Sequence, residues 1–229
     1  MNPSDHPAAW DHPPTRRAWF KYLTASLTAF FGWIALWFAL LAFLAVFVTP
    51  GYTVLFVPFL VYSFYRAFIQ VFSILFAFRT KRVLQIYPWR LFSDIPHGIA
   101  DRTDVVGRQY GWFEFPNPAR PDEQLPMVFP RHWGVGWWGR RMAPKAAPNL
   151  KEQISVVWLA GDPRFIGVIA APSPDGRMPR RFRFLHQQMR ANGTVSSVTD
   201  WGATPEDIER SRRAGIRPTN FDPPTTMKP

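Results

Sequence analysis

The chain contains no cysteine among its 229 residues. This absence excludes disulfide bonds, thiolate zinc sites, iron–sulfur clusters and cysteine nucleophiles. Acidic residues are missing from a long stretch, because no Asp or Glu occurs between Asp11 and Asp94. Catalytic patterns such as HExxH and GxSxG do not occur, and the histidines lack ligand spacing. We therefore expect a protein that is not an enzyme and that uses no cofactor, metal ion or small-molecule substrate.

Two long apolar runs stand where charge is missing, over residues 23–48 and 54–78. Each run is about 25 residues long, which is enough for a helix to cross the ~30 Å hydrocarbon core of a membrane. Residues 49–53 contain a proline–glycine turn without charge. The first run is longer than the ~7–15 apolar residues of a signal peptide, so we expect it to be retained. The two runs predict a transmembrane hairpin over residues 19–82.

Aromatic and basic residues flank both spans, as is typical of the membrane–water interface. The residues that we expect to contact lipid there are Trp19, Lys21, Arg79, Lys81 and Arg82. Basic charge lies at both outer ends of the hairpin, whereas the connecting turn is neutral. The positive-inside rule then predicts a plasma membrane protein with the bilayer as partner and with both the N- and C-termini in the cytoplasm.

Arg66 is the only charged residue within the two spans, and it lies near the middle of the second. An arginine at the centre of a span costs ~2.5–3.5 kcal/mol on insertion scales. Tyr62 and Gln70 lie one helical turn to either side, on the same helix face. Two interpretations remain open. These three residues form an intramembrane interface with another copy or another membrane protein, or the Arg66 side chain reaches water from a long, tilted helix.

Residues 83–190 predict a small antiparallel β-rich domain. The strands of its clearest part, a three-stranded meander, are 154–159, 165–170 and 181–184. Weaker strand candidates are 83–92 and 110–115, and the proline-rich loops are 116–130 and 143–149. A sheet of this size gains stability from packing on the hairpin or on another copy.

Both ends of the chain lack an apolar pattern. Residues 1–18 are rich in proline and are predicted to form a disordered tail. Residues 191–229 predict a polar linker, a short helix over 205–214 and a second disordered tail. Thr204 before the helix is a favourable N-cap, with proline and acids in the first turn. The expected fold class is an α+β membrane protein, with an N-terminal two-helix transmembrane hairpin, a small antiparallel β-rich cytoplasmic domain and a short C-terminal helix.

Two basic segments of the β-rich domain allow more than one interpretation. Residues 132–141 combine three tryptophans with two arginines, which suits either a membrane headgroup layer or the core of a small sheet. A second group consists of Arg177, Arg180, Arg181, Arg183 and Arg190. This group suits anionic lipid or a solvated strand face. Nucleic acid is not expected, because no binding motif accompanies these arginines.

Two short segments, RVLQIYPWR at 82–90 and VWLAGDPRF at 157–165, accompany the hairpin and its basic, proline-rich start. Together these features resemble uncharacterised actinobacterial two-pass integral membrane proteins. The resemblance covers most of residues 20–185 and implies a bacterial plasma membrane, but no activity. We expect a membrane-anchored interaction or regulatory protein. The alternative is an accessory subunit of a transport or secretion complex that assembles through the hairpin, as a homo-oligomer or with another membrane protein.

Overall fold

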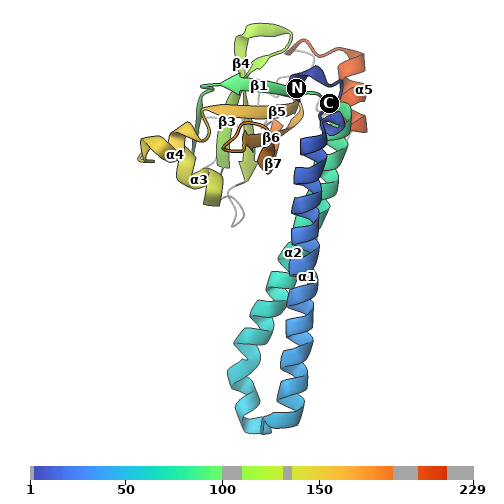
Figure 1. The fold of residues 1–229 in the computed structure, drawn as a ribbon, viewed down its shortest axis with the longest axis vertical. Coiled ribbons are helices and arrows are strands. Elements are labelled where there is room, and N and C mark those ends of the chain that lie inside the picture. Colours follow the sequence, from blue (N-terminus) through green and yellow to red (C-terminus); the bar gives the residue numbers. More distant parts are fainter. Residues whose placement is uncertain (1–2, 100–109, 131–135, 188–200, 216–229) are drawn as a thin grey trace, which may run out of the picture. The chain divides into compact units, whose positions relative to one another are not determined.

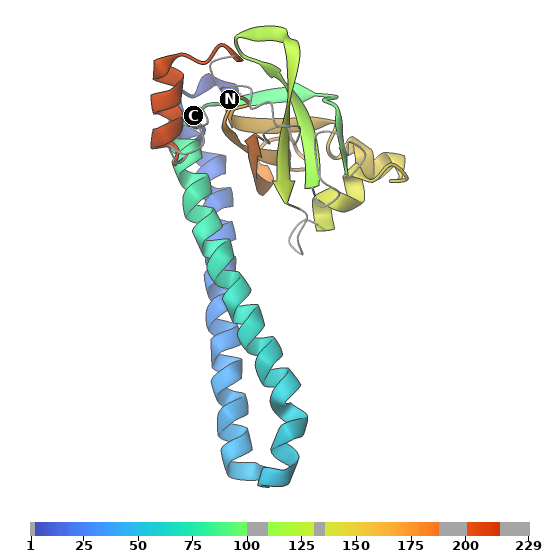
Figure 2. The same cartoon turned by 180° about the vertical axis from the view of Figure 1, so that it is seen from behind.

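The structure is a computed structural model, and it describes residues 3–99, 110–130, 136–187 and 201–215. The chain divides into two compact units. The first unit, residues 17–79, contains the helical hairpin. The second unit, which we call the sheet unit, combines residues 1–16 with residues 80–229. Figures 1 and 2 show the elements of each unit from opposite sides.

Two long helices form the hairpin, α1 (Pro13–Phe47) and α2 (Val57–Ile86), and the 3-10 helix η3 (Pro50–Phe56) joins them. Both are long and apolar enough to cross a membrane. Away from the connecting turn, both helices extend beyond the predicted spans, because the helical backbone continues into polar and basic residues. With 35 and 30 residues, their lengths are about 52 and 45 Å, beyond the ~30 Å hydrocarbon core.

Small side chains lie where the two helices of the hairpin pack together. Ser26, Ser63, Ala67 and Ala77 are all buried. Small residues allow two helix backbones to approach closely within a membrane. The hydroxyl groups of Ser26 and Ser63 each donate to a carbonyl oxygen of their own helix at 3.0 Å. Their burial therefore leaves no hydroxyl donor unsatisfied.

The outward surface of the hairpin is apolar. Every exposed large hydrophobic side chain that the structure describes, except Leu91, lies between Phe20 and Phe78. Phe31, for example, is 64 % exposed. Monomeric soluble proteins rarely expose contiguous apolar patches beyond a few hundred Å².

The sheet unit is built on one antiparallel sheet of seven strands. The strands are β1 (Trp89–Ser93), β2 (His97–Ile99), β3 (Tyr110–Asn117), β4 (Arg120–Pro130), β5 (Val156–Asp162), β6 (Ile166–Pro172) and β7 (Pro179–Gln187). Their spatial order is β1-β5-β6-β7-β4-β3-β2. The helices of this unit are α3 (Gly136–Met142), α4 (Pro148–Glu152) and α5 (Pro205–Arg213). The predicted layout is thus confirmed: two apolar helices, an antiparallel sheet that contains the meander, and a short C-terminal helix.

Several segments differ from the sequence prediction, including the short helices α3 and α4, which were not expected. Residues 116–130, predicted as a loop, belong to the β3–β4 hairpin. Among the described residues, β4 pairs with β7 at Met127 and Val128, and its pairing with β3 accommodates the prolines of this segment. The strand predicted over residues 83–92 begins only at Trp89, because its first four residues complete the last turn of α2.

The N-terminal segment also differs from its prediction. Residues 1–18 were expected to be disordered, but residues 3–16 fold as part of the sheet unit, with the 3-10 turns η1 (Pro3–Asp5) and η2 (Ala9–Asp11) before α1. The proline content predicted disorder, but α1 already begins at Pro13. Proline content carries no information about tertiary contacts, and those contacts order the segment.

Buried hydrogen bonds attach this segment to the start of the sheet. The Trp89 indole Nε1 donates to Thr15 Oγ1 at 2.9 Å. The same oxygen lies 3.0 Å from His12 Nδ1, and the Ala9 amide donates to the Tyr87 carbonyl oxygen at 2.8 Å. Trp89, Thr15 and His12 are each at most 4 % exposed. The N-terminal segment therefore covers part of the sheet instead of extending into solvent.

Hydrophobic side chains fill both faces of the sheet. The main core contains Ile95, Phe113, Phe115, Met127, Phe129, Trp138, Met142, Ile154, Val157, Leu159, Ile169, Ala171 and Leu185. Trp138 and Met142 belong to α3, so this helix covers the face on which the cluster lies. On the opposite face, Trp89 packs against Trp158 and Phe182, with ring centroids 5.7 and 6.5 Å apart.

Candidate functional site

The polar site within the hairpin is centred on Arg66 of α2. Its guanidinium carbon lies 5.3 Å from the ring centroid of Trp33 on α1, a cation–π contact. The Trp33 ring also meets Tyr62 edge-on, with centroids 5.7 Å apart. Of the predicted interface residues, the structure thus brings Arg66 and Tyr62 to one tryptophan, while Gln70 is half-buried one turn further along α2.

Trp33 was not predicted as part of this site, although a signal for it exists in the sequence. Counting outward from the turn at residues 49–53 places positions 33 and 66 at similar depths in the two helices. An antiparallel hairpin brings residues at similar depth together. A tryptophan at the depth of an unpaired arginine is therefore a candidate for contact.

The Arg66 guanidinium is only partly compensated. Its Nε is buried and has no hydrogen-bond partner in the part of the chain that the structure describes. Over the same residues, no carboxylate lies within ion-pair distance of it. A cation–π contact is worth roughly 0.5–2 kcal/mol, which is less than the ~2.5–3.5 kcal/mol cost of a central arginine. The contact with Trp33 therefore offsets only part of this cost.

The predicted lipid-interface residues differ in their burial. Trp19 is buried, and its indole Nε1 donates to the Ala77 carbonyl oxygen at 2.8 Å, so this side chain joins α1 to α2. Lys21, Arg79 and Arg82 are exposed. Lys81, the remaining predicted residue, is half-buried, with its Nζ 5.1 Å from the Trp10 ring centroid.

A buried charge network lies in the sheet unit around Arg164, in the turn between β5 and β6. Arg164 Nε and Nη2 donate to the two carboxylate oxygens of Asp162 at 3.0 and 2.6 Å. Nη2 also donates to Asp207 Oδ2 at 2.9 Å, and Nη1 donates to the Gly202 carbonyl oxygen at 2.9 Å. Asp207 belongs to α5, where it forms a capping box with Thr204. Arg164 thus attaches the C-terminal helix to the sheet.

The network shifts the pKa values of its members. Burial lowers the pKa of Arg164, but hydrogen bonds and charges from Asp162 and Asp207 outweigh it, so the pKa is raised. For Asp207, burial acts to raise the pKa. Hydrogen bonds with Thr204 and the charge of Arg164 outweigh this effect, so the pKa is lowered. Burial and the charge of Asp162 raise the pKa of the Tyr87 hydroxyl. The charges of Arg164, Asp162 and Asp207 compensate one another within this network.

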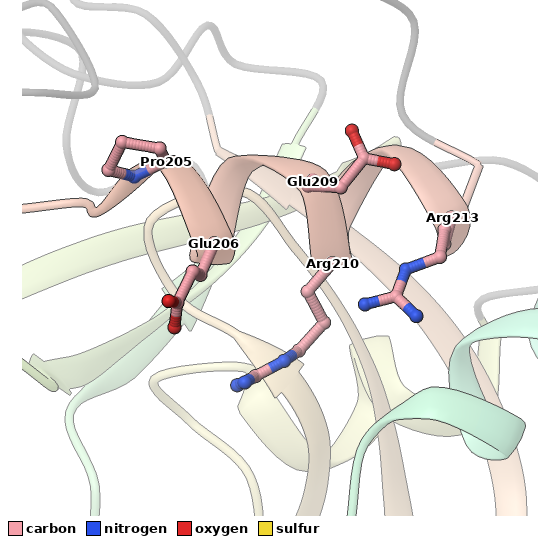
Figure 3. Close-up of a pocket in the computed structure, with 5 residues that line it drawn as sticks. All are labelled: Pro205, Glu206, Glu209, Arg210 and Arg213. Carbon is pink, nitrogen blue, oxygen red and sulfur yellow. The ribbon is translucent and has the colours of Figure 1, made fainter.

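An open hollow lies along α5 and is lined by Pro205, Glu206, Glu209, Arg210 and Arg213 (Figure 3). Two acidic and two basic side chains share this helix face, so the charges of the hollow favour neither an anionic nor a cationic ligand. Among the residues described, no three His, Asp or Glu side chains are placed to hold a metal ion. Comparisons of the chain with protein-family models, with curated proteins and with solved structures each gave no match.

Proposed function

We propose that this chain is a two-pass integral protein of a bacterial plasma membrane, in which the hairpin anchors a cytoplasmic sheet unit. We further propose that it acts as an interaction or regulatory protein and not as an enzyme. The apolar outward surface between Phe20 and Phe78 carries the anchoring proposal. Such surface is stable against lipid tails but not against water. The bacterial assignment is supported by the resemblance of residues 82–90 and 157–165.

The charge distribution supports the proposed orientation. Basic residues stand at the outer ends of both helices: Arg16, Arg17, Lys21, Arg79, Lys81 and Arg82. The opposite end of the hairpin, residues 49–53, carries no charge. Loops rich in Lys and Arg stay in the cytoplasm, whereas an uncharged turn crosses the membrane readily. Both termini are therefore assigned to the cytoplasm.

Because the chain has no native cysteine, single-cysteine labelling tests both anchoring and orientation. Tyr52→Cys places a thiol in the turn, and Arg212→Cys places one on the exposed side of α5. We expect a membrane-impermeant maleimide to label Tyr52→Cys in intact cells and Arg212→Cys only after permeabilisation. The reverse pattern would invert the orientation. Release of the protein from membranes by alkaline carbonate would refute integral insertion.

A second candidate function is an accessory subunit of a transport or secretion complex that assembles through the hairpin. The observation in its favour is the buried Arg66 Nε without a hydrogen-bond partner among the described residues. A carboxylate or carbonyl oxygen from another membrane helix would satisfy this donor at a depth where water is scarce. That helix belongs either to a second copy of this chain or to another membrane protein.

Cross-linking in native membranes tests this second function. Wild type, Arg66→Leu and the control Arg79→Leu are compared, since Arg79 is an exposed arginine at the end of the apolar part of α2. If Arg66 holds a neighbouring helix, only Arg66→Leu loses the cross-linked species. Cross-linking that is equal in all three proteins counts against assembly through Arg66 and leaves the hairpin as an anchor.

A further inference from the structure

Three arginines gather around one tryptophan at the surface of the sheet unit, and the charge of a fourth, Arg140, acts on the nearest of them. We name this group the Trp137 cluster, and its members are Trp137, Arg140, Arg141, Arg180 and Arg181. The Arg141 guanidinium carbon lies 3.8 Å from a Trp137 ring centroid, and those of Arg180 and Arg181 lie at 5.7 and 6.0 Å. The first three members belong to α3 and the last two to β7. The fold therefore joins two basic segments that are far apart in the sequence.

The backbone around the cluster is fixed by contacts outside it. The register of β6 and β7 shifts between Ile169 and Ala171, and Arg181 on β7 has a φ of 58°. The Arg181 carbonyl oxygen accepts a hydrogen bond from Trp138 Nε1 at 2.9 Å, and the Trp138 ring is fully buried in the core. This bond attaches α3 to β7, so the position of the cluster does not depend on its own guanidinium groups.

Hydrogen bonds also orient three of the arginine side chains, and the first is from Arg140 Nε to the Gly136 carbonyl oxygen at 3.2 Å. Arg141 Nε and Nη2 donate to Gln153 Oε1 at 3.1 and 2.7 Å, and its Nη1 donates to the Trp137 carbonyl oxygen at 2.9 Å. Arg180 Nε donates to the Pro172 carbonyl oxygen at 2.8 Å. A guanidinium has five N–H donors, and Arg180 uses one of them in this bond. Most of the Arg180 donors are therefore left for another acceptor.

The cluster has no compensating negative charge among the described residues. No ion pair there involves any of its four arginines. Arg141 is only 9 % exposed. Burial lowers the pKa of Arg141, and the charges of Arg140, Arg180 and Arg181 lower it further. Like charges held this close repel one another, and a bound anion would relieve that repulsion.

We propose that the Trp137 cluster binds a phosphate group, supplied by the headgroup of an anionic phospholipid. Guanidinium groups match phosphate oxygens in geometry and charge, and several of them converge here. Tryptophan beside arginine is typical of the headgroup layer of a membrane. The choice of lipid as the phosphate source rests on the proposed membrane anchoring, whereas binding of phosphate by the cluster does not.

Chain connectivity and shape favour lipid over nucleic acid. The sheet begins at Trp89, only two residues after α2 ends at Ile86, so an anchored hairpin keeps the sheet unit near headgroups. Non-specific binding of single-stranded nucleic acid needs aromatic faces on which bases stack, along a basic groove. The Arg141 guanidinium carbon already lies 3.8 Å from the Trp137 ring centroid, and Arg180 and Arg181 lie over the same ring at 5.7 and 6.0 Å, so this ring is occupied by arginine and not open to a base.

Titration of the full chain in a neutral detergent tests this inference. The probes are dihexanoyl-phosphatidylglycerol, dihexanoyl-phosphatidylcholine with the same tails, inorganic phosphate and a short single-stranded oligonucleotide, each followed by calorimetry. The variant is Arg140→Gln with Arg181→Gln, both exposed positions, and the control is the exposed Arg90→Gln on β1. We expect the double variant to lower the affinity for phosphatidylglycerol by at least about tenfold, because each charge-assisted hydrogen bond contributes about that factor. The control should change it less than twofold.

Several outcomes would overturn the inference. Equal affinity of wild type and the double variant for phosphatidylglycerol removes the cluster as the site, provided that both proteins show the same circular dichroism and urea midpoint. Equal or tighter binding of phosphatidylcholine or inorganic phosphate removes the anionic lipid, and tighter binding of the oligonucleotide replaces lipid with nucleic acid. Carbonate extraction tests anchoring separately. A protein that carbonate releases, but that still binds phosphatidylglycerol through the cluster, refutes only the proposed anchor.

Discussion

Replacement of Arg164 by methionine should destabilise the sheet unit strongly. The Arg164 side chain is 5 % exposed and that of its partner Asp162 is 9 % exposed, so the substitution leaves a buried carboxylate without its cation. Asp207, 19 % exposed, loses the same cation. Breaking a buried ion pair from one side costs roughly 3–5 kcal/mol. With a urea dependence of about 1.5 kcal/mol per molar, the lower figure corresponds to a midpoint about 2 M lower.

The measurement is urea unfolding of the full chain in neutral detergent, followed by tryptophan emission. The matched control is Arg212→Met, because Arg212 faces Glu209 at 3.8 Å with both side chains about half exposed. Exposed pairs contribute only about 0–1 kcal/mol. Adding Asp162→Asn to Arg164→Met should restore part of the loss, since it removes the buried unpaired charge. If Arg164→Met lowers the midpoint no more than Arg212→Met does, the network does not stabilise the fold.

Three further substitutions test individual contacts by the same measurement. Thr15→Val keeps the side-chain volume but leaves the buried Trp89 Nε1 without its acceptor, so unfolding should become easier by about 1–3 kcal/mol; Thr24→Val, on the exposed surface of α1, is the control. Tyr87→Phe removes a buried hydroxyl that has no hydrogen-bond partner among the described residues, so the variant should be at least as stable as wild type at pH 7. Because the pKa of Tyr87 is raised in the folded protein, this tyrosine ionises at lower pH in the unfolded chain. Wild type should therefore lose stability as the pH rises above about 10, and Tyr87→Phe should lose less. Parallel pH profiles of the two proteins would contradict this reasoning. The lowered pKa of Asp207 has the opposite sign: its contribution is complete above the unfolded pKa of about 3.9 and disappears as the pH falls through the lower folded value. The difference between wild type and Asp207→Asn should therefore shrink below about pH 4 and stay constant from pH 5 to 7.

Patterns that are local in the sequence predicted the two long helices, the C-terminal helix and the meander, but not the short helices α3 and α4. The apolar runs on either side of the turn at 49–53 determine α1 and α2, because length and hydropathy alone define a candidate span. The capping signals around Thr204 predicted α5, and the structure contains the capping box that they imply. Each of these elements depends on residues within a few positions of one another.

The features that the sequence did not reveal all depend on distant partners. Residues 3–16 are ordered by Trp89, which lies 74 positions after Thr15. The turn at Asp162 and Arg164 was recognised, but not its ion pair with Asp207, which is 43 positions from Arg164. Prolines predicted a loop over 116–130, whereas the pairing of β3 with β4 makes this segment a hairpin. Tertiary context therefore overrides local composition at each of these places.

Three buried or half-buried arginines differ in the partners that compensate their charge. Arg164 has two carboxylates and a carbonyl oxygen, so its charge is compensated within the described part of the chain. Arg141 has an amide and a carbonyl oxygen but no carboxylate there, and the contact found for Arg66 among the described residues is an aromatic ring. A charge satisfied within the fold stabilises the fold, whereas an uncompensated buried charge costs free energy unless something else binds it. Loss of Arg164 should therefore appear in unfolding experiments. Loss of Arg66, or of the exposed arginines around Arg141, should instead appear in assembly and lipid binding, with the urea midpoint little changed.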